Sequence, residues 1–138
     1  MRRVVPAVLL LLCLTSCQTT SSSARDPLAG AWELVSGHAT TTDGKVLDYI
    51  GAKAQKVLSD GHFAFVTVAP TGTVAAGSGT YTISGSTYTE VVTNTAGHPA
   101  TGTYTFTWRV EGDKWYHTGS SASGTKYEEV WRRLRSGA

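Results

Sequence analysis

Short runs of alternating apolar and polar residues, separated by turns that contain glycine, fill the chain from residue 31 onward. A period of two places alternate side chains on opposite faces of a β-strand. In the clearest run, residues 103–110, four large apolar residues share one face, while three threonines and an arginine take the other. The other runs cover residues 32–35, 56–59, 62–68, 80–83, 87–92, 114–118 and 125–134. This pattern predicts an all-β domain.

Tight turns join these strands. Asp60-Gly61 is a strong turn signal because both residues tolerate positive φ, and Ser84-Gly85-Ser86 predicts a hairpin. A helical turn is conceivable only at residues 48–55, where Gly51 argues against a long helix. About eight antiparallel strands without a long helix form either a closed up-and-down barrel or a two-sheet sandwich. The pattern favours the barrel. Side chains could fill the interior of such a barrel, or the interior could hold one small ligand.

The first seventeen residues follow a different pattern. Arg2 and Arg3 precede an apolar run over residues 4–14, and the segment ends in Leu14-Thr15-Ser16-Cys17. A spanning helix needs about 20 apolar residues, so this shorter run is typical of an export signal. Its last four residues resemble the lipobox of bacterial lipoproteins, in which the cysteine is acylated and becomes the new N-terminus. The alternative is an ordinary secretory signal with an incidental cysteine.

The resemblance implies three segments along the chain. Residues 1–17 would be a lipoprotein signal peptide with lipobox Cys17, residues 18–27 a flexible Ser/Thr-rich tether, and residues 28–135 a single domain. The protein is then expected to be exported and lipid-anchored to the bacterial cell envelope. The anchor would sit on the non-cytoplasmic face of the outer or the cytoplasmic membrane.

Composition then excludes several classes of function. Cys13 would leave with the signal and Cys17 would carry the lipid, so disulfides, cysteine-based zinc sites and a cysteine nucleophile are excluded from the domain. Without Arg2 and Arg3, the chain has ten basic and ten acidic residues. This near-neutral net charge gives no electrostatic footprint for nucleic acid. The four histidines lack metal-ligand spacing, so neither a metal nor another cofactor is predicted.

Three polar residues lie in phase with aromatic neighbours on their own strands: Glu90, His117 and Glu129. Pointing inward, they could bind the polar end of a ligand or act as acid and base. Pointing outward, they would be solvated or paired with Arg109, Arg133 or a tyrosine hydroxyl. His62 lies opposite Phe63 and Phe65, which are the better core candidates. The predicted ligand-binding residues are Tyr88, Glu90, Tyr104, Phe106, Trp108, Trp115, His117, Tyr127 and Glu129.

The two ends of the domain resemble the lipocalin (calycin) superfamily. Gly30-Ala31-Trp32 opens the first strand, and Trp131-Arg132-Arg133 closes the last. In that superfamily the tryptophan plugs one end of the barrel and an arginine packs across its ring. Trp32 would be this tryptophan and Arg132 or Arg133 the arginine. A guanidinium over an indole contributes roughly 0.5–2 kcal/mol.

The middle of the chain resembles a group of small bacterial lipocalin-like domains of undefined function. The resemblance rests on Lys56-Val57-Leu58, His62-Phe63-Ala64-Phe65, residues 77–83, Tyr88-Thr89-Glu90 and residues 128–131. It implies the barrel fold more firmly than an activity. The leading hypothesis for function is a membrane-anchored protein that binds a small, mostly apolar ligand, hydrophobic or aromatic, inside the barrel. No catalytic residue is assigned. The alternatives are an isomerase or cyclase using acid/base side chains, and a ligand-free envelope scaffold with residues 93–101 as a rim loop.

Overall fold

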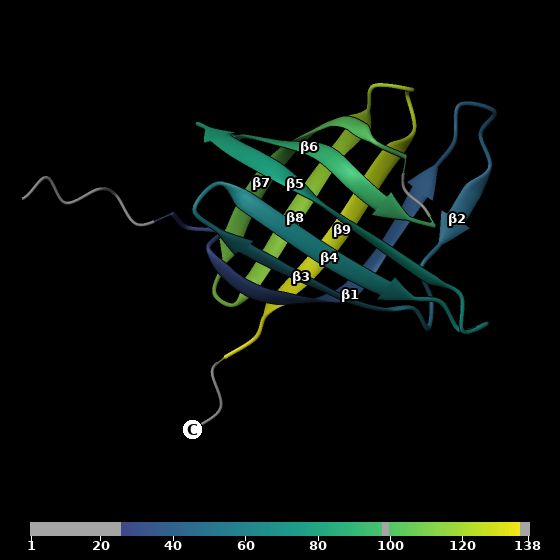
Figure 1. The fold of residues 1–138 in the computed structure, drawn as a ribbon, viewed down its shortest axis with the longest axis horizontal. Helices are drawn as coiled ribbons and strands as arrows, with labels where there is room; N and C mark the ends of the chain where they lie inside the picture. Colours follow the sequence, from purple (N-terminus) through teal and green to yellow (C-terminus); the bar gives the residue numbers. More distant parts are fainter. Residues whose placement is uncertain (1–25, 98–99, 136–138) are drawn as a thin grey trace, which may run out of the picture.

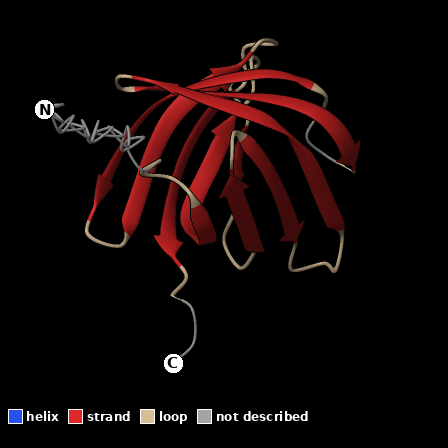
Figure 2. Ribbon diagram, turned by 60° about the vertical axis from the view of Figure 1, so that its left-hand side comes forward, coloured by secondary structure: helices blue, strands red, loops and turns tan. Residues whose placement is uncertain are grey.

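Nine β-strands follow one another in the computed structural model, which describes residues 26–97 and 100–135 (Figure 1). They are β1 (Gly30–Thr40), β2 (Val46–Asp48), β3 (Lys53–Ser59), β4 (His62–Val68), β5 (Val74–Ser84), β6 (Thr87–Ala96), β7 (Gly102–Glu111), β8 (Lys114–Ser121) and β9 (Lys126–Arg133). Figure 2 shows strands and connecting loops throughout this part of the chain. The predicted signal segment and Cys17 lie outside the described residues.

Eight of the strands close into a barrel. β1 and β3 to β9 pair with their neighbours in chain order, and β9 returns to pair with β1 from Trp32↔Arg133 to Thr40↔Lys126. β2 is a short addition that pairs with the last residues of β1. The prediction of an antiparallel up-and-down barrel of about eight strands is therefore confirmed, and the sandwich is excluded.

Two local predictions can be compared directly with the backbone. Asp60 and Gly61 both have positive φ, 50° and 75°, as the predicted turn between β3 and β4 requires. Residues 48–55 form no helix. The backbone N–H of Ala52 donates to the carbonyl of Tyr49, which closes a turn between β2 and β3.

Trp32 seals one end of the barrel, which we call the closed end. Its ring is fully buried, and its indole N–H donates to the carbonyl of Leu28. The guanidinium of Arg133 lies 4.0 Å from the ring centroid and donates to the carbonyls of Ala29 and Pro27. Both ends of the described chain leave the barrel here, as Figure 1 shows. Arg132, the other candidate, is exposed and pairs with Glu33 instead.

Large side chains fill the half of the barrel next to the closed end. The ring of Trp115 contacts those of Trp32 and Tyr88 edge to face, with centroids 5.4 and 5.2 Å apart. Leu28, Leu58, Phe63 and Tyr81 complete this packed half. The predicted choice of Phe63 over His62 for the core is confirmed, since Phe63 is buried and His62 is exposed.

Candidate ligand-binding cavity

The other half of the barrel, toward the open end, contains a cavity of about 560 Å³. The difference between the halves follows from residue size at the inward positions. On β3 these positions run from Ala54 through Lys56 to Leu58, and Ala39 and Ala75 also line the cavity. Because small residues leave interior space that aromatic residues would fill, the barrel is packed at one end and hollow at the other.

The cavity walls are mostly apolar and aromatic, and its mouth is mostly polar. The walls include Leu34, Phe65, Val92, Tyr104, Phe106, Tyr127 and Trp131. The mouth is formed by Thr41, Ala100, Ser123 and Thr125 at the ends of the open-end loops. A volume of this size is in the usual range for pockets that hold small molecules.

A buried ion pair forms part of the cavity floor. The Nζ atom of Lys56 lies 2.5 Å from Oε1 of Glu90, and the two side chains are only 5% and 6% exposed. The hydroxyl of Tyr88 donates to the same oxygen, at 2.6 Å. The ammonium also lies 5.2 Å from the ring centroid of Trp131 and 5.5 Å from that of Trp115. Such a pair is retained only when its geometry offsets the loss of hydration.

Glu129 and His117 form a second polar pair beside the first. The Nε2 atom of His117 lies 2.6 Å from Oε2 of Glu129, and the indole N–H of Trp131 donates to that oxygen at 2.9 Å. Burial alone would raise the pKa of Glu129, but the charge and hydrogen bond of His117, together with Lys56, lower this pKa to about 2. Glu129 is therefore a carboxylate at neutral pH.

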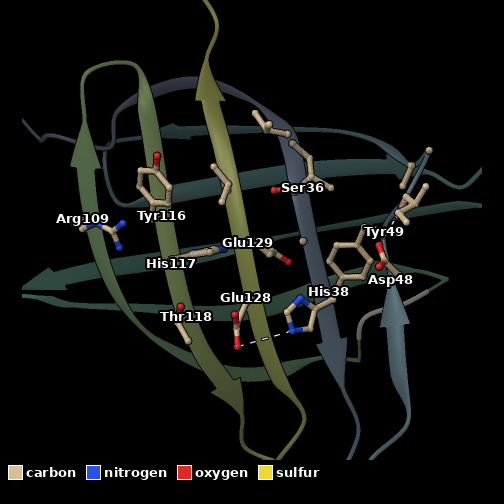
Figure 3. A pocket seen from close by; sticks show the side chains of 17 residues that line it. Ser36, His38, Asp48, Tyr49, Arg109, Tyr116, His117, Thr118, Glu128 and Glu129 are labelled. Carbon is tan, nitrogen blue, oxygen red and sulfur yellow. Dashed lines mark hydrogen bonds and ion pairs between the residues drawn. The ribbon is translucent and has the colours of Figure 1, made fainter.

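Tyr49 lies where the cavity meets a groove on the outer wall. This groove, of about 630 Å³, runs along β8, β9 and β1, and Figure 3 shows Tyr116, Thr118 and Glu128 on its surface. Tyr49 and Glu129 line both spaces. The Tyr49 ring packs over Gly37, where an added Cβ would lie 3.0 Å from its Cδ2 atom. The tyrosine thus forms part of the wall between groove and cavity.

Five of the nine predicted ligand-binding residues line the cavity: Glu90, Tyr104, Phe106, Tyr127 and Glu129. The other four do not. Tyr88 and Trp115 belong to the packed half, and His117 is fully buried behind Glu129. Trp108 shares the phase of Tyr104 and Phe106 but lies near the closed end, where its indole N–H donates to the carbonyl of Gly85.

Most residues that line the cavity were not predicted as ligand-binding from the sequence, and Lys56 and Tyr49 are two of them. Lys56 lies in phase with the inward-facing Ala54 and Leu58 on β3. That phase was the available signal. The sequence contained no such signal for Tyr49, because this residue lies in a turn outside the strand pattern. Of the predicted rim loop, Thr93–Ala96 belongs to β6, Ala100 lines the cavity, and residues 98–99 lie outside the described part.

Two further features were sought within residues 26–97 and 100–135. No cluster of three or more potential metal ligands from histidine, cysteine, aspartate and glutamate occurs among them. In the same ranges, no helix has the length and hydropathy needed to cross a membrane.

The fold is similar to that of several solved β-barrels. A de novo designed fluorescence-activating β-barrel is 18% identical, with a TM-score of 0.50, and the match covers 77% of this chain and 93% of the design. A redesigned β-barrel is 15% identical, with a TM-score of 0.51 and coverage of 78% and 92%. A lipocalin-like protein from Bacteroides uniformis is 18% identical, with a TM-score of 0.46 and coverage of 78% and 98%.

A search of curated proteins found no match. Residues 27–138 match a family model described as a domain of unknown function (DUF4488). This match spans all nine strands of the barrel. The chain therefore belongs to the DUF4488 family.

Proposed function

We propose that this protein is a lipid-anchored, lipocalin-like binding protein whose barrel holds one small, mostly apolar molecule. The observation that carries the proposal is the open cavity of about 560 Å³, with apolar and aromatic walls and a charged floor. Pockets with a few convergent polar groups in an apolar surround are typical of small-molecule sites. Burial of apolar ligand surface contributes roughly 25 cal/mol per Å², so even a modest ligand gains several kcal/mol on entering such a cavity.

The charges at the floor favour binding over acid/base catalysis by an isomerase or cyclase. Glu90 is engaged by Lys56 and Tyr88, and Glu129 by His117 and Trp131. With its pKa lowered to about 2, Glu129 holds no proton to donate at neutral pH and is a weak base. These groups are better suited to orienting a polar head group than to transferring protons.

The lipid anchor is the second part of the proposal. It rests on Leu14-Thr15-Ser16-Cys17 at the end of an apolar segment, as in bacterial lipoproteins. Expression with radiolabelled palmitate should label the wild-type protein but not Cys17→Ser, with Cys13→Ser as the matched control. Equal labelling of the wild type and Cys17→Ser would refute the anchor and leave the cavity unaffected.

Ligand binding is tested by filling the cavity. Ala54→Phe places a ring in the hollow half, whereas Ala64→Phe adds the same ring at an exposed position of the neighbouring strand β4. We expect wild type and Ala64→Phe to bind members of a panel of small aromatic and aliphatic molecules in native mass spectrometry. Ala54→Phe should lose at least about tenfold in affinity. A wild-type protein that binds nothing in the panel and carries nothing from its source would refute the proposal.

A further inference from the structure

Building on the proposed function, we propose that the cavity selects amphiphilic amines: the ligand's ammonium group binds the carboxylates of Glu90 and Glu129, and its apolar body fills the aromatic walls. The argument concerns which polar atoms of the floor remain available to a ligand. Four charged or titratable side chains meet there. Their contacts leave carboxylate oxygens free on residues that line the cavity, whereas the buried nitrogens without a partner, Trp115 Nε1 and His117 Nδ1, belong to residues that do not line it.

Lys56 is not available to an anionic ligand. Its ammonium already lies 2.5 Å from Glu90, and both side chains are almost fully buried. An anion that drew Lys56 away would leave Glu90 charged and uncompensated in the barrel interior, which is strongly unfavourable. The cation at the floor is thus committed to a partner within the protein.

The carboxylates, by contrast, are only half used. Lys56 and Tyr88 both contact Oε1 of Glu90, and His117 and Trp131 both contact Oε2 of Glu129. Within the described residues, the second oxygen of each carboxylate accepts no hydrogen bond, yet neither is among the fully buried side-chain atoms that lack a partner. Both residues line the cavity. The floor therefore offers charged acceptors, which bind a charged donor most strongly.

The aromatic walls also suit a cation. Lys56 shows that an ammonium is accommodated here, since its Nζ lies 5.2 to 5.8 Å from the centroids of Phe63, Phe65, Trp115 and Trp131. Trp131 and Phe65 also line the cavity, together with Phe106 and Tyr127. A ligand ammonium would gain cation–π attraction from such rings. A ligand carboxylate would face two carboxylates and the negative faces of the rings, and the ammonium of Lys56, which also lines the cavity, is already paired with Glu90.

The test compares three probes that share one apolar body: 2-(2-naphthyl)ethylamine, 2-(2-naphthyl)ethanol and 3-(2-naphthyl)propanoate. Titration calorimetry at pH 7 uses the chain from residue 18 onward, which keeps all nine described strands. We expect the amine to bind at least about tenfold more tightly than the alcohol, and the propanoate more weakly than either.

Glu129→Gln keeps the shape of the side chain but removes its charge. It should reduce the tenfold preference for the amine, taken as the ratio of the amine and alcohol affinities of the same variant, to about twofold or less, and measurable binding of the alcohol shows that the cavity is intact. Glu128→Gln is the matched control. This substitution removes the same charge, but from the outer face of the barrel, where the Glu128 side chain is 62% exposed. It should leave the preference unchanged.

The outcomes separate the two proposals. Tighter binding of the propanoate or the alcohol than of the amine by the wild type overturns the amine selectivity but supports a ligand-binding cavity. An amine preference that survives in Glu129→Gln, or falls equally in Glu128→Gln, overturns the role of the floor carboxylates. Failure of all three probes counts against the cavity as a binding site, and the amine selectivity falls with it.

Discussion

Replacing Lys56 by methionine is expected to lower the free energy of unfolding by about 3–5 kcal/mol, because it leaves Glu90 charged and buried. The two charged atoms lie 2.5 Å apart, with side chains 5% and 6% exposed. In Lys56→Met, the described contacts leave the Tyr88 hydroxyl as the one donor to that carboxylate. Domains of this size are stable by about 5–15 kcal/mol, so the loss is a large share of the total.

The chain contains a matched surface pair for comparison. Arg132 lies 2.5 Å from Glu33, the same distance, but these side chains are 53% and 34% exposed. Exposed pairs contribute about 0–1 kcal/mol, so Arg132→Met should have a small effect. The difference between Lys56→Met and Arg132→Met therefore measures burial rather than contact distance.

A double variant separates the ion pair from the packing of its side chains. Lys56→Met with Glu90→Gln removes both charges and keeps both shapes, and we expect it to recover all but about 1 kcal/mol of the loss. Urea unfolding at pH 7, followed by tryptophan fluorescence, should show a midpoint lower by roughly 2 M for Lys56→Met alone. The reasoning is refuted if Lys56→Met is no less stable than Arg132→Met, or if the double variant is less stable than the single one.

Three further predictions concern the closed end, the strand pairing and the second polar pair. Arg133→Met removes the guanidinium over Trp32 and its two carbonyl hydrogen bonds, which should lower the unfolding free energy by about 1–3 kcal/mol in thermal denaturation. Gly79→Ala would place a Cβ 1.8 Å from the carbonyl oxygen of Val91, so circular dichroism should show loss of the cooperative transition. The pKa of Glu129 falls from an ordinary 4.5 to about 2, so its carboxylate stabilises the fold above pH 4.5, and this contribution is lost as the pH falls toward 2. Urea midpoints in that range should depend less on pH in Glu129→Gln than in the wild type.

Each of these has a clear contrary result. Equal destabilisation by Arg132→Met and Arg133→Met would remove the special role of the arginine over Trp32. A Gly79→Ala protein with wild-type stability would mean that β5 and β6 do not pair as described. An equally steep acid dependence in the Glu129→Gln variant would assign the acid sensitivity to other carboxyl groups.

The fold could be predicted because alternation and turns are local signals. Each strand carries its own period of two, and the Asp60-Gly61 turn adopts the positive φ angles that its residues favour. Which face of a strand points inward is not local, because it depends on how all eight strands close. That is why the inward orientation of Glu90 could not be decided from its phase with Tyr88 and Val92 alone.

The site itself depends on contacts between residues that lie far apart in the sequence. Lys56 and Glu90 are 34 positions apart, and the sequence pattern of neither strand indicates that the two side chains meet. The hollow half likewise depends on small residues from separate strands, among them Ala39, Ala54 and Ala75, meeting at one level of the barrel. Trp108 illustrates the converse, since its phase was right but its height along the strand placed it beyond the cavity.

With the proposed anchor at Cys17, the exit of both ends of the described chain beside Trp32 would favour one direction for the barrel to face. A tether leading from Cys17 would join the barrel at its sealed base, so the opening framed by Thr41 and Ser123 would look away from the bilayer. Cargo would then be exchanged with the aqueous compartment, or with a second macromolecule approaching from it, rather than drawn directly from the lipids underneath. An anchored protein of this geometry would bind its ligand through an opening that faces away from the membrane.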